Sequence, residues 1–588
     1  MSDPPKQSPK SKVQSPKSEN TPVLAKENEG LKSGRNAGEI AGETTGVVGA
    51  STGAFPRQPA TEPSRRDSGR SALMVGAGIL LSRIIGVIRQ RVFGHYLGIS
   101  DSAGAFNAAF RIPNFLQNIF GEGALSASFI PVYAKLLATK DEEEASRVAD
   151  AIFTLLALAT SVIVVVGVLI TPQIITVIAP GFTGSTRELT IQLVRIFFPG
   201  AGLLVLSAWC LGVLNSHRRF FLSYTAPVVW NLAIIATLVW FGSTSDQARL
   251  AVVAAWGSVV GSALQFGVQL PTVFRLIKRV RPVLDVVSAN VRQVIKNFFP
   301  VFVSRGVVQI SAFVDSMLAS LISPQAVAAL MYAQSLYTLP VSLFGMSVSA
   351  AELPEMSSAV GTSEEVAATL RKRLNAGLRR IALFIVPSVV AMLTLGDIMT
   401  AVLYQTGRFD RSASIYVWGI LAGSTIGLLA STLGRLYAST YYALHDTRTP
   451  LLYAALRVST GIALGYVIAL YGPDWIGIDQ KWGAAGLTAA SGIAGWIEFI
   501  LLRRTLNKRI GRTGLPAGYM AKLWVSAIGG AALGWGIKLL IGPRHPAIVA
   551  SLVLIPYGLV YFGLAWVWRV PEAAAVINRS LSTLRLKS

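Results

Sequence analysis

The sequence predicts an all-α polytopic membrane protein, and its composition and its hydropathy pattern are the two observations behind this prediction. Of the 588 residues, 52% are hydrophobic and only 14% are charged, whereas charged residues make up about 25% of a typical soluble protein. Long apolar runs follow one another from residue 72 to residue 568, and a run of about 20 apolar residues spans a bilayer as a helix. Counting by length gives about 14 transmembrane helices.

The chain before the first span has a different composition. Residues 1–70 are rich in Pro, Ser, Lys, Gly and Glu, and QSPKS occurs twice, at 7–11 and 14–18. Such a segment buries too little apolar surface to offset the entropy of ordering, so a disordered cytoplasmic tail is expected. It lacks the cationic start and short apolar core of a signal peptide, so no cleavage is expected.

The spans divide the rest of the chain into lobes. The predicted N-terminal lobe covers 71–275, a cytoplasmic linker covers 276–295, and the C-terminal lobe covers 296–505; two additional helices and a short cytoplasmic tail occupy 506–588. The spans begin near residues 72, 104, 149, 191, 222, 249, 297, 326, 378, 413, 449, 483, 518 and 546.

Proline spacing indicates that the two lobes are repeats. Pro131 and Pro354 are 223 residues apart, and so are Pro227 and Pro450. Six spans separate the members of each pair, and an even number of crossings preserves direction. The sequence therefore predicts two six-helix lobes related by a pseudo-two-fold axis along the membrane normal, a transporter design with its site between the lobes.

Loop charges predict the orientation. Loops on the side of the termini carry about 22 Lys and Arg and the opposite loops about 6, so both termini are expected to be cytoplasmic. The net charge of +23 then reflects topology and anionic headgroups, and no motif points to nucleic acid. The single Cys210 excludes an internal disulfide, and the four histidines are scattered. No catalytic set or phosphate-binding glycine loop is visible, so the chain is not expected to be an enzyme.

Several charged residues fall inside the predicted spans, where a charge costs several kcal/mol and usually faces a cavity or a partner. Arginines outnumber acids among them, which suits a phosphate-bearing substrate because the guanidinium fork forms two parallel hydrogen bonds. Arg457 and Glu498 lie at matching depths of neighbouring antiparallel spans, which predicts a structural ion pair. Glu122 is interpreted either as the partner of an arginine or as a proton or cation switch. The full set is Arg83, Arg89, Arg91, Arg111, Glu122, Arg305, Asp315, Arg435, Arg457 and Glu498.

The second span, FRIPNFLQNIFGEGALSASFIPVYAK (110–135), closely resembles the second helix of the MurJ/MviN family, the lipid II flippases of the multidrug/oligosaccharidyl-lipid/polysaccharide exporter superfamily. LSRIIGVIRQ (81–90) is similar to the family's first helix, and ALHDTRTPL (443–451) is similar to its loop before the eleventh. The resemblance covers about residues 71–570. It implies a substrate-binding set of Arg83, Arg89, Arg111, Asn114, Glu122 and Arg305.

Four positions depart from the family pattern. Gly104 stands where the family usually has an acid, Gln117 where it has a cavity arginine, and Gln334 and Ser335 where it has an Asp-Arg pair. Sodium-binding family members use an acid in the seventh helix, so Asp315 is a candidate for ion coupling. The ligands expected from the eleventh and twelfth helices are not evident, and Gly465 stands at one such position.

The resemblance implies a flippase of the bacterial inner membrane. It would move an undecaprenyl-diphosphate-linked muropeptide, lipid II, between leaflets by alternating access, with no cofactor beyond Na⁺ or H⁺ coupling or the membrane potential. Membrane lipids are expected partners, and the chain is expected to act as a monomer or with cell-wall synthesis proteins. Flipping of another polyprenyl-linked glycan, and a transport-impaired paralogue that acts as a scaffold, remain alternatives.

Pro113 and the pair Gly121 and Gly123 are expected to bend the second helix, because proline removes a backbone hydrogen bond. The bend would turn Arg111 and Glu122 toward a wet cleft between the lobes.

Overall fold

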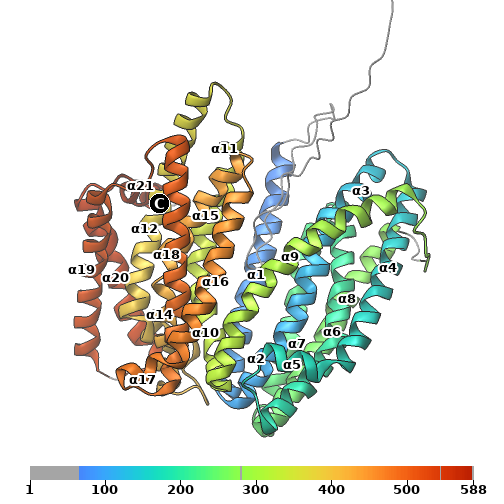
Figure 1. The fold of residues 1–588 in the computed structure, drawn as a ribbon, viewed down its shortest axis with the longest axis horizontal. Coiled ribbons are helices and arrows are strands. Elements are labelled where there is room, and N and C mark those ends of the chain that lie inside the picture. The colour runs from blue at the N-terminus through green and yellow to red at the C-terminus, as the bar shows by residue number, and fades with distance from the viewer. Residues whose placement is uncertain (1–64, 278–280, 543, 586–588) are drawn as a thin grey trace, which may run out of the picture. The chain divides into compact units, whose positions relative to one another are not determined.

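The computed structural model describes residues 65–277, 281–542 and 544–585, with the side chains of 65–77, 79, 121–122, 303–312 and 579–585 left out of the description. The chain divides into one unit over residues 1–39 and a second over 40–588, and all described residues belong to the second. Residues 1–64 of the predicted tail fall outside the described residues, whereas residues 65–70, which the prediction also assigns to the tail, are helical. In the described ranges the secondary structure is helical, as predicted (Figure 1).

The N-terminal bundle follows the predicted order of spans. The second span starts as an α-helix, becomes π-helical at the predicted break, and then continues as an α-helix. Its elements are α1 (Arg65–Leu97), α2 (Asp101–Leu116), η1 (Gln117–Leu125), α3 (Ser126–Ala138), α4 (Glu142–Leu169), α5 (Thr171–Ile178), α6 (Gly184–Ser216), α7 (Phe220–Phe241) and α8 (Gln247–Ile277).

The C-terminal bundle and the two additional helices complete the fold. The bundle consists of α9 (Ala289–Ile322), α10 (Pro324–Pro340), η2 (Val341–Met346), α11 (Ser347–Ser357), α12 (Ser363–Thr394), α13 (Gly396–Tyr404), α14 (Arg411–Thr425), α15 (Leu428–Ala443), α16 (Arg448–Leu470), α17 (Gly472–Ile476), η3 (Gln480–Trp482) and α18 (Gly483–Ile510). It is followed by α19 (Ala517–Ile541), α20 (Pro546–Val567) and α21 (Pro571–Arg585).

The 223-residue repeat extends to the helix boundaries. Shifting α2 by 223 residues gives 324–339, and α10 covers Pro324–Pro340. The same shift places α1 on 288–320, over α9, and α4 on 365–392, inside α12. It also carries 118–123, inside the π-helical η1, onto the π-helical η2 at Val341–Met346. The two bundles are therefore repeats that keep even a local irregularity, as two lobes in pseudo-two-fold arrangement require.

Ten helical spans in the described residues are long and apolar enough to cross a membrane, and the bent pair α14 and α15, with 41° between them, makes eleven. The three other predicted spans correspond to α1, to α2 with η1 and α3, and to α9. A total of 14 spans is therefore compatible with the structure.

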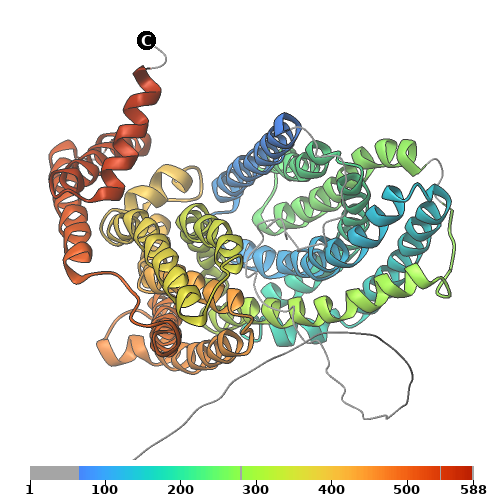
Figure 2. The same cartoon turned by 90° about the horizontal axis from the view of Figure 1, so that it is seen from above.

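The helix α9 contacts both bundles. Its first turn is attached to the start of α4, where Glu144 Oε1 accepts hydrogen bonds from Ser288 Oγ (2.9 Å) and Asn290 Nδ2 (3.0 Å). Further along, α9 packs against α10, α16 and α18. Both views show it running obliquely from α3 and α4 toward the base of the C-terminal bundle (Figures 1 and 2). Residues on α9 can therefore meet side chains from either bundle.

Candidate functional site

Arg89 lies inside the N-terminal bundle rather than toward lipid. Its guanidinium carbon is 5.0 Å from the centroid of the Phe110 ring and 5.7 Å from that of Trp230, and the two rings stack on each other. A cavity of about 20 Å³ beside it is lined by residues of α1, α2 and α7 and by Met331 of α10. Stacking on aromatic faces stabilises a buried guanidinium, and this arrangement places the Arg89 cation next to the opposite bundle.

Arg83 and Asn114 occupy different environments. Arg83 lies six residues before Arg89 on α1 and is partly buried. Asn114 Nδ2 donates to the Phe110 carbonyl of its own helix (3.2 Å), one turn earlier. This bond adds a donor to the turn that contains Pro113, directly before the π-helical segment. The side chains of Glu122 and Arg305 lie outside the described residues.

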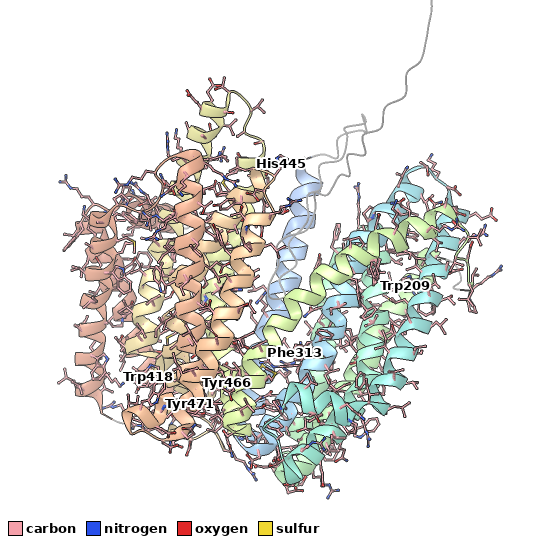
Figure 3. All side chains as sticks on the ribbon, in the orientation of Figure 1. Trp209, Phe313, Trp418, His445, Tyr466 and Tyr471 are labelled. Atoms are coloured by element: carbon pink, nitrogen blue, oxygen red, sulfur yellow. The ribbon has the colours of Figure 1, made fainter. Side chains whose placement is uncertain are left out.

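A polar cluster joins the two bundles at Asp315 of α9. Ser491 Oγ of α18 donates to Asp315 Oδ1 (3.3 Å). The cations whose charges act on this carboxylate are Arg111 of α2 and Arg457 of α16. Phe313, labelled in Figure 3, contacts Phe115 of α2 edge-to-face at 5.3 Å. Asp315 therefore interacts with one cation from each repeat.

The rest of the cluster belongs to the C-terminal bundle. Arg457 Nε lies 3.1 Å from Glu498 Oε2, the pairing that their matching depths predict. Arg435 of α15 interacts electrostatically with Tyr337, Arg457 and Glu498, and the Tyr337 hydroxyl is 2.9 Å from Ser431 Oγ. We call the set of Arg111, Asp315, Tyr337, Arg435, Arg457 and Glu498 the polar cluster. Its three arginines and two acids leave one net positive charge.

The polar cluster contains a buried donor without an acceptor. Arg435 Nε makes no hydrogen bond among the described residues, and a buried polar group left unsatisfied costs about 1–3 kcal/mol. Such a group is a candidate for ligand binding. Sequence reasoning gave Arg435 no role beyond its position, and it did not single out Tyr337 or Ser491, because neutral hydroxyl groups carry no hydropathy signal.

The two bundles are tied together at the C-terminal end of α1. Arg91 Nη1 donates to the carbonyls of Val402 (2.6 Å) and Leu403 (3.0 Å) at the end of α13. His95 Nδ1 lies 2.8 Å from Thr406 Oγ1, and the Tyr332 hydroxyl donates to the Gly98 carbonyl (3.0 Å). Gly98, at φ 58°, ends α1, a conformation that glycine adopts without strain.

Comparison with known proteins identifies the family. The family model "Lipid II flippase MurJ" matches residues 93–555. The chain belongs to this family. Relatives include the lipid II flippase MurJ of Burkholderia cenocepacia, 29% identical over 85% of this chain and 97% of the relative. A probable lipid II flippase MurJ of Rhizobium tropici is 30% identical over 74% of this chain and 80% of the relative.

Solved structures show the same fold. A lipid II flippase MurJ in an inward closed conformation superposes with a TM-score of 0.69 at 23% identity, covering 84% of this chain and 98% of that chain. An inward-facing multidrug resistance transporter of the MATE family gives 0.58 at 15% identity, covering 74% and 98%. The MurJ family member described here therefore shares its fold with both proteins.

The structure gives a packing reason for one departure from the MurJ pattern. A Cβ at Gly104 would clash with the Pro324 carbonyl, where the start of α2 meets the start of α10. A side chain is therefore excluded by the close approach of the helices. Gly465 is buried, and a Cβ there would lie 2.8 Å from Leu487 Cδ1. The Leu487 side chain therefore fills the space that a side chain at this position would need. Ser335 Oγ donates to its own helix at Met331 (3.0 Å), and Gln117 and Gln334 are partly buried.

Proposed function

We propose that this chain is a lipid II flippase, which moves a polyprenyl-diphosphate-linked muropeptide from the inner to the outer leaflet. The observation that carries the proposal is the match of the MurJ family model to residues 93–555. The site chemistry supports it, because a diphosphate requires cations inside the membrane. Arg89 and the polar cluster place arginines from both repeats between the bundles, and guanidinium groups bind phosphate oxygens through paired hydrogen bonds.

Each group has a proposed role. Arg83 and Arg89 attract the diphosphate on the N-terminal side. Arg111 gives up its interaction with Asp315 and binds the substrate instead. Arg435 offers its buried Nε to a substrate oxygen, which would satisfy this donor. Arg457 and Glu498 hold each other and fix the position of the cluster. The isoprenoid tail stays in lipid throughout, because moving it through a basic site would lose its hydrophobic contacts.

Movement of the bundles follows from where they are tied. Arg91, His95 and Tyr332 close the outer ends, which corresponds to a state loaded from the inner side. Release to the outer leaflet requires these hydrogen bonds to break while the two bundles rotate relative to each other. Transfer of the single net positive charge of the polar cluster through 100 mV is worth about 2.3 kcal/mol, so the membrane potential can drive one step.

The surroundings of Asp315 do not fit a sodium site. Two guanidinium groups already act on the carboxylate, and a nearby cation disfavours binding of a second cation. Na⁺ would also need several oxygen ligands, whereas Ser491 supplies one hydroxyl. Asp315 is proposed to be the counter-ion of Arg111 and Arg457, and no transport step is assigned to Na⁺.

The proposed setting is the bacterial inner membrane with both termini in the cytoplasm, as the loop charges predict. The chain acts as a transporter without catalysing a covalent step. It works as a monomer or beside cell-wall synthesis proteins, and the additional helices pack on the C-terminal bundle, where the hydroxyls of Tyr557 and Tyr561 donate to carbonyls of α12.

Complementation tests the proposal. The chain is expressed in a bacterium depleted of its own lipid II flippase, and lipid II in the outer leaflet is measured by an externally added probe. The unmodified chain should restore growth and labelling, Arg89→Ala should abolish both, and Arg89→Lys should retain part because the charge remains. The control is Arg249→Ala, an exposed arginine near the start of α8, which should behave as wild type.

Membrane levels of each variant are measured by immunoblot to separate misfolding from lost transport. Lack of rescue by a well-expressed unmodified chain would refute lipid II as the substrate. Rescue that survives Arg89→Ala together with Arg83→Ala would favour a scaffold role, since a scaffold needs no cation in the site.

A further inference from the structure

A groove lies on the outside of the N-terminal bundle, away from the site described above. It has a volume of about 540 Å³ and is lined by one face of α6 together with Trp256 of α8. The lining includes the polar residues Glu188, Gln192 and Arg195, and all three are exposed. The proposed transport cycle uses none of these residues.

The groove points away from the C-terminal bundle. Phe197 follows Glu188 by nine residues, which is two and a half helical turns, so the two lie on opposite faces of α6. Phe197 packs against Phe106 and Phe110 of α2, and α2 is the helix that contacts α10 of the other bundle. Glu188, Gln192 and Arg195 therefore face lipid on the far side of the bundle.

Polar and apolar residues are ordered along this face. Glu188, Gln192 and Arg195 come first, and the same face continues with Pro199, Leu203 and Leu206. The neighbouring helices provide exposed apolar side chains, namely Val162, Val165 and Leu169 on α4 and Trp256, Val260 and Leu264 on α8. A polar end followed by an apolar strip matches a phospholipid, whose headgroup lies outside its acyl chains.

Neighbouring helices give the depth of Arg195. A Cβ at Gly167 would contact the ring of Phe198. Phe198 is therefore level with Gly167, the third residue from the end of α4, which ends at Leu169. Arg195 lies three residues nearer the helix start and is thus level with the end of that span. A Cβ at Gly200 would lie 3.3 Å from Val259, which places Glu188 level with the first residue of α8. With the proposed orientation, Arg195 lies at the outer interface and Glu188 about 10 Å further out.

The geometry points to a binding site for one phospholipid of the outer leaflet whose headgroup carries both a phosphate and a primary ammonium. Arg195, the deeper residue, binds the phosphodiester. Glu188, further out, accepts hydrogen bonds from the ammonium, with the Gln192 amide between them, and the acyl chains lie along Pro199, Leu203 and Leu206. An anionic headgroup without an amine would leave the Glu188 carboxylate uncompensated. A trimethylammonium headgroup has no N–H to donate to it.

Native mass spectrometry of the full chain tests this site. Protein purified in detergent and stripped of lipid is titrated with phosphatidylethanolamine, phosphatidylglycerol or phosphatidylcholine, and the first bound lipid is quantified. Wild type should bind phosphatidylethanolamine tightest. Arg195→Gln should weaken that binding about tenfold, the loss of a charge-assisted hydrogen bond. Arg411→Gln, which removes an exposed cation at the start of α14 in the C-terminal bundle, should match wild type.

Glu188→Gln separates the two halves of the proposal. It should reduce binding of phosphatidylethanolamine and leave phosphatidylglycerol unchanged or tighter, so that the preference between them disappears. Equal effects of Arg195→Gln and Arg411→Gln would overturn the site, and this is also the result expected if a partner helix fills the groove. Equal loss of both lipids in Glu188→Gln, or no preference in wild type, would overturn the ammonium assignment. Both outcomes are independent of whether the chain rescues flippase-depleted cells.

Discussion

Breaking the Arg457–Glu498 ion pair by Glu498→Gln should destabilise the C-terminal bundle by about 2–3 kcal/mol. At the observed 3.1 Å, Coulomb's law gives an attraction of about 5 kcal/mol with an effective dielectric of about 20. We reduce this by about half because the Arg457 side chain is 34% exposed and exposure weakens an ion pair. Arg435, which interacts with both residues, adds to the loss because the remaining arginines then repel each other.

The measurement is unfolding in mixed micelles as the fraction of denaturing detergent rises, followed by circular dichroism. The double variant Arg457→Gln with Glu498→Gln should recover part of the loss, because removal of both ions also removes their desolvation cost. The control is Asp479→Asn, which breaks the Lys481–Asp479 pair at the same 3.1 Å but with both side chains more than half exposed. It should cost less than about 1 kcal/mol.

The cycle has a definite contrary result. If the stability losses of the two single variants add in the double variant, Arg457 and Glu498 do not interact. The polar cluster then contains no fixed ion pair. If Asp479→Asn costs as much as Glu498→Gln, burial in the membrane does not strengthen the pair, and the magnitude above is wrong.

Three further predictions follow from other parts of the structure. Gly104→Ala should destabilise the chain by about 1–3 kcal/mol in the same unfolding assay, because the added methyl meets the Pro324 backbone in a close-packed contact; Gly267→Ala, with no heavy atom within 4 Å of its Cβ, is the control and should be neutral. His95→Cys with Thr406→Cys, in a Cys210→Ala background, should form a disulfide, since His95 Nδ1 and Thr406 Oγ1 lie 2.8 Å apart. The disulfide should stop exposure of lipid II, and a reductant should restore it. Transport by the oxidised form would show that the outer ends need not separate. Backbone N–H groups of Ser288 and Val287, with Arg147, hold the pKa of Asp285 below its ordinary value. The stabilisation of residues 286–288 by this carboxylate is therefore complete above about pH 4 and is lost as the pH falls through the lowered pKa. Asp285→Asn should speed amide exchange at residues 286–288 several-fold at neutral pH, and unchanged exchange would contradict this.

Properties that depend on short stretches of sequence were predictable. Apolar length gave the positions of the spans, and the helix pairs α1 and α9, α2 and α10, and α4 and α12 carry the 223-residue spacing that two pairs of prolines indicated. The irregularity predicted around Pro113, Gly121 and Gly123 coincides with a π-helical segment, η1. Proline spacing shows where a helix is irregular, but the form of the irregularity depends on how neighbouring helices pack against it.

The polar cluster depended on tertiary structure. The matching depths of Arg457 and Glu498 predicted one pair, because two adjacent antiparallel helices fix depth by counting residues. Asp315 meeting Arg111 and Ser491 could not be counted in this way, since the residues come from three helices whose rotation is set by bundle packing. The same holds for Gly104, which sequence comparison treats as a lost charge and the structure shows to be a contact with Pro324.

The sequence by itself determined the helical class, the positions and repeat of the spans, the family, and the presence of arginines at membrane depth. These properties follow from composition and from the order of residues along the chain, which are the same however the helices pack. Only the tertiary structure decided which charges face one another, that Arg89 stacks on two aromatic rings, and that the polar face of α6 looks outward. Each of these depends on the rotation and contact of helices far apart in sequence, and such contacts are selected by the free energy of the whole bundle.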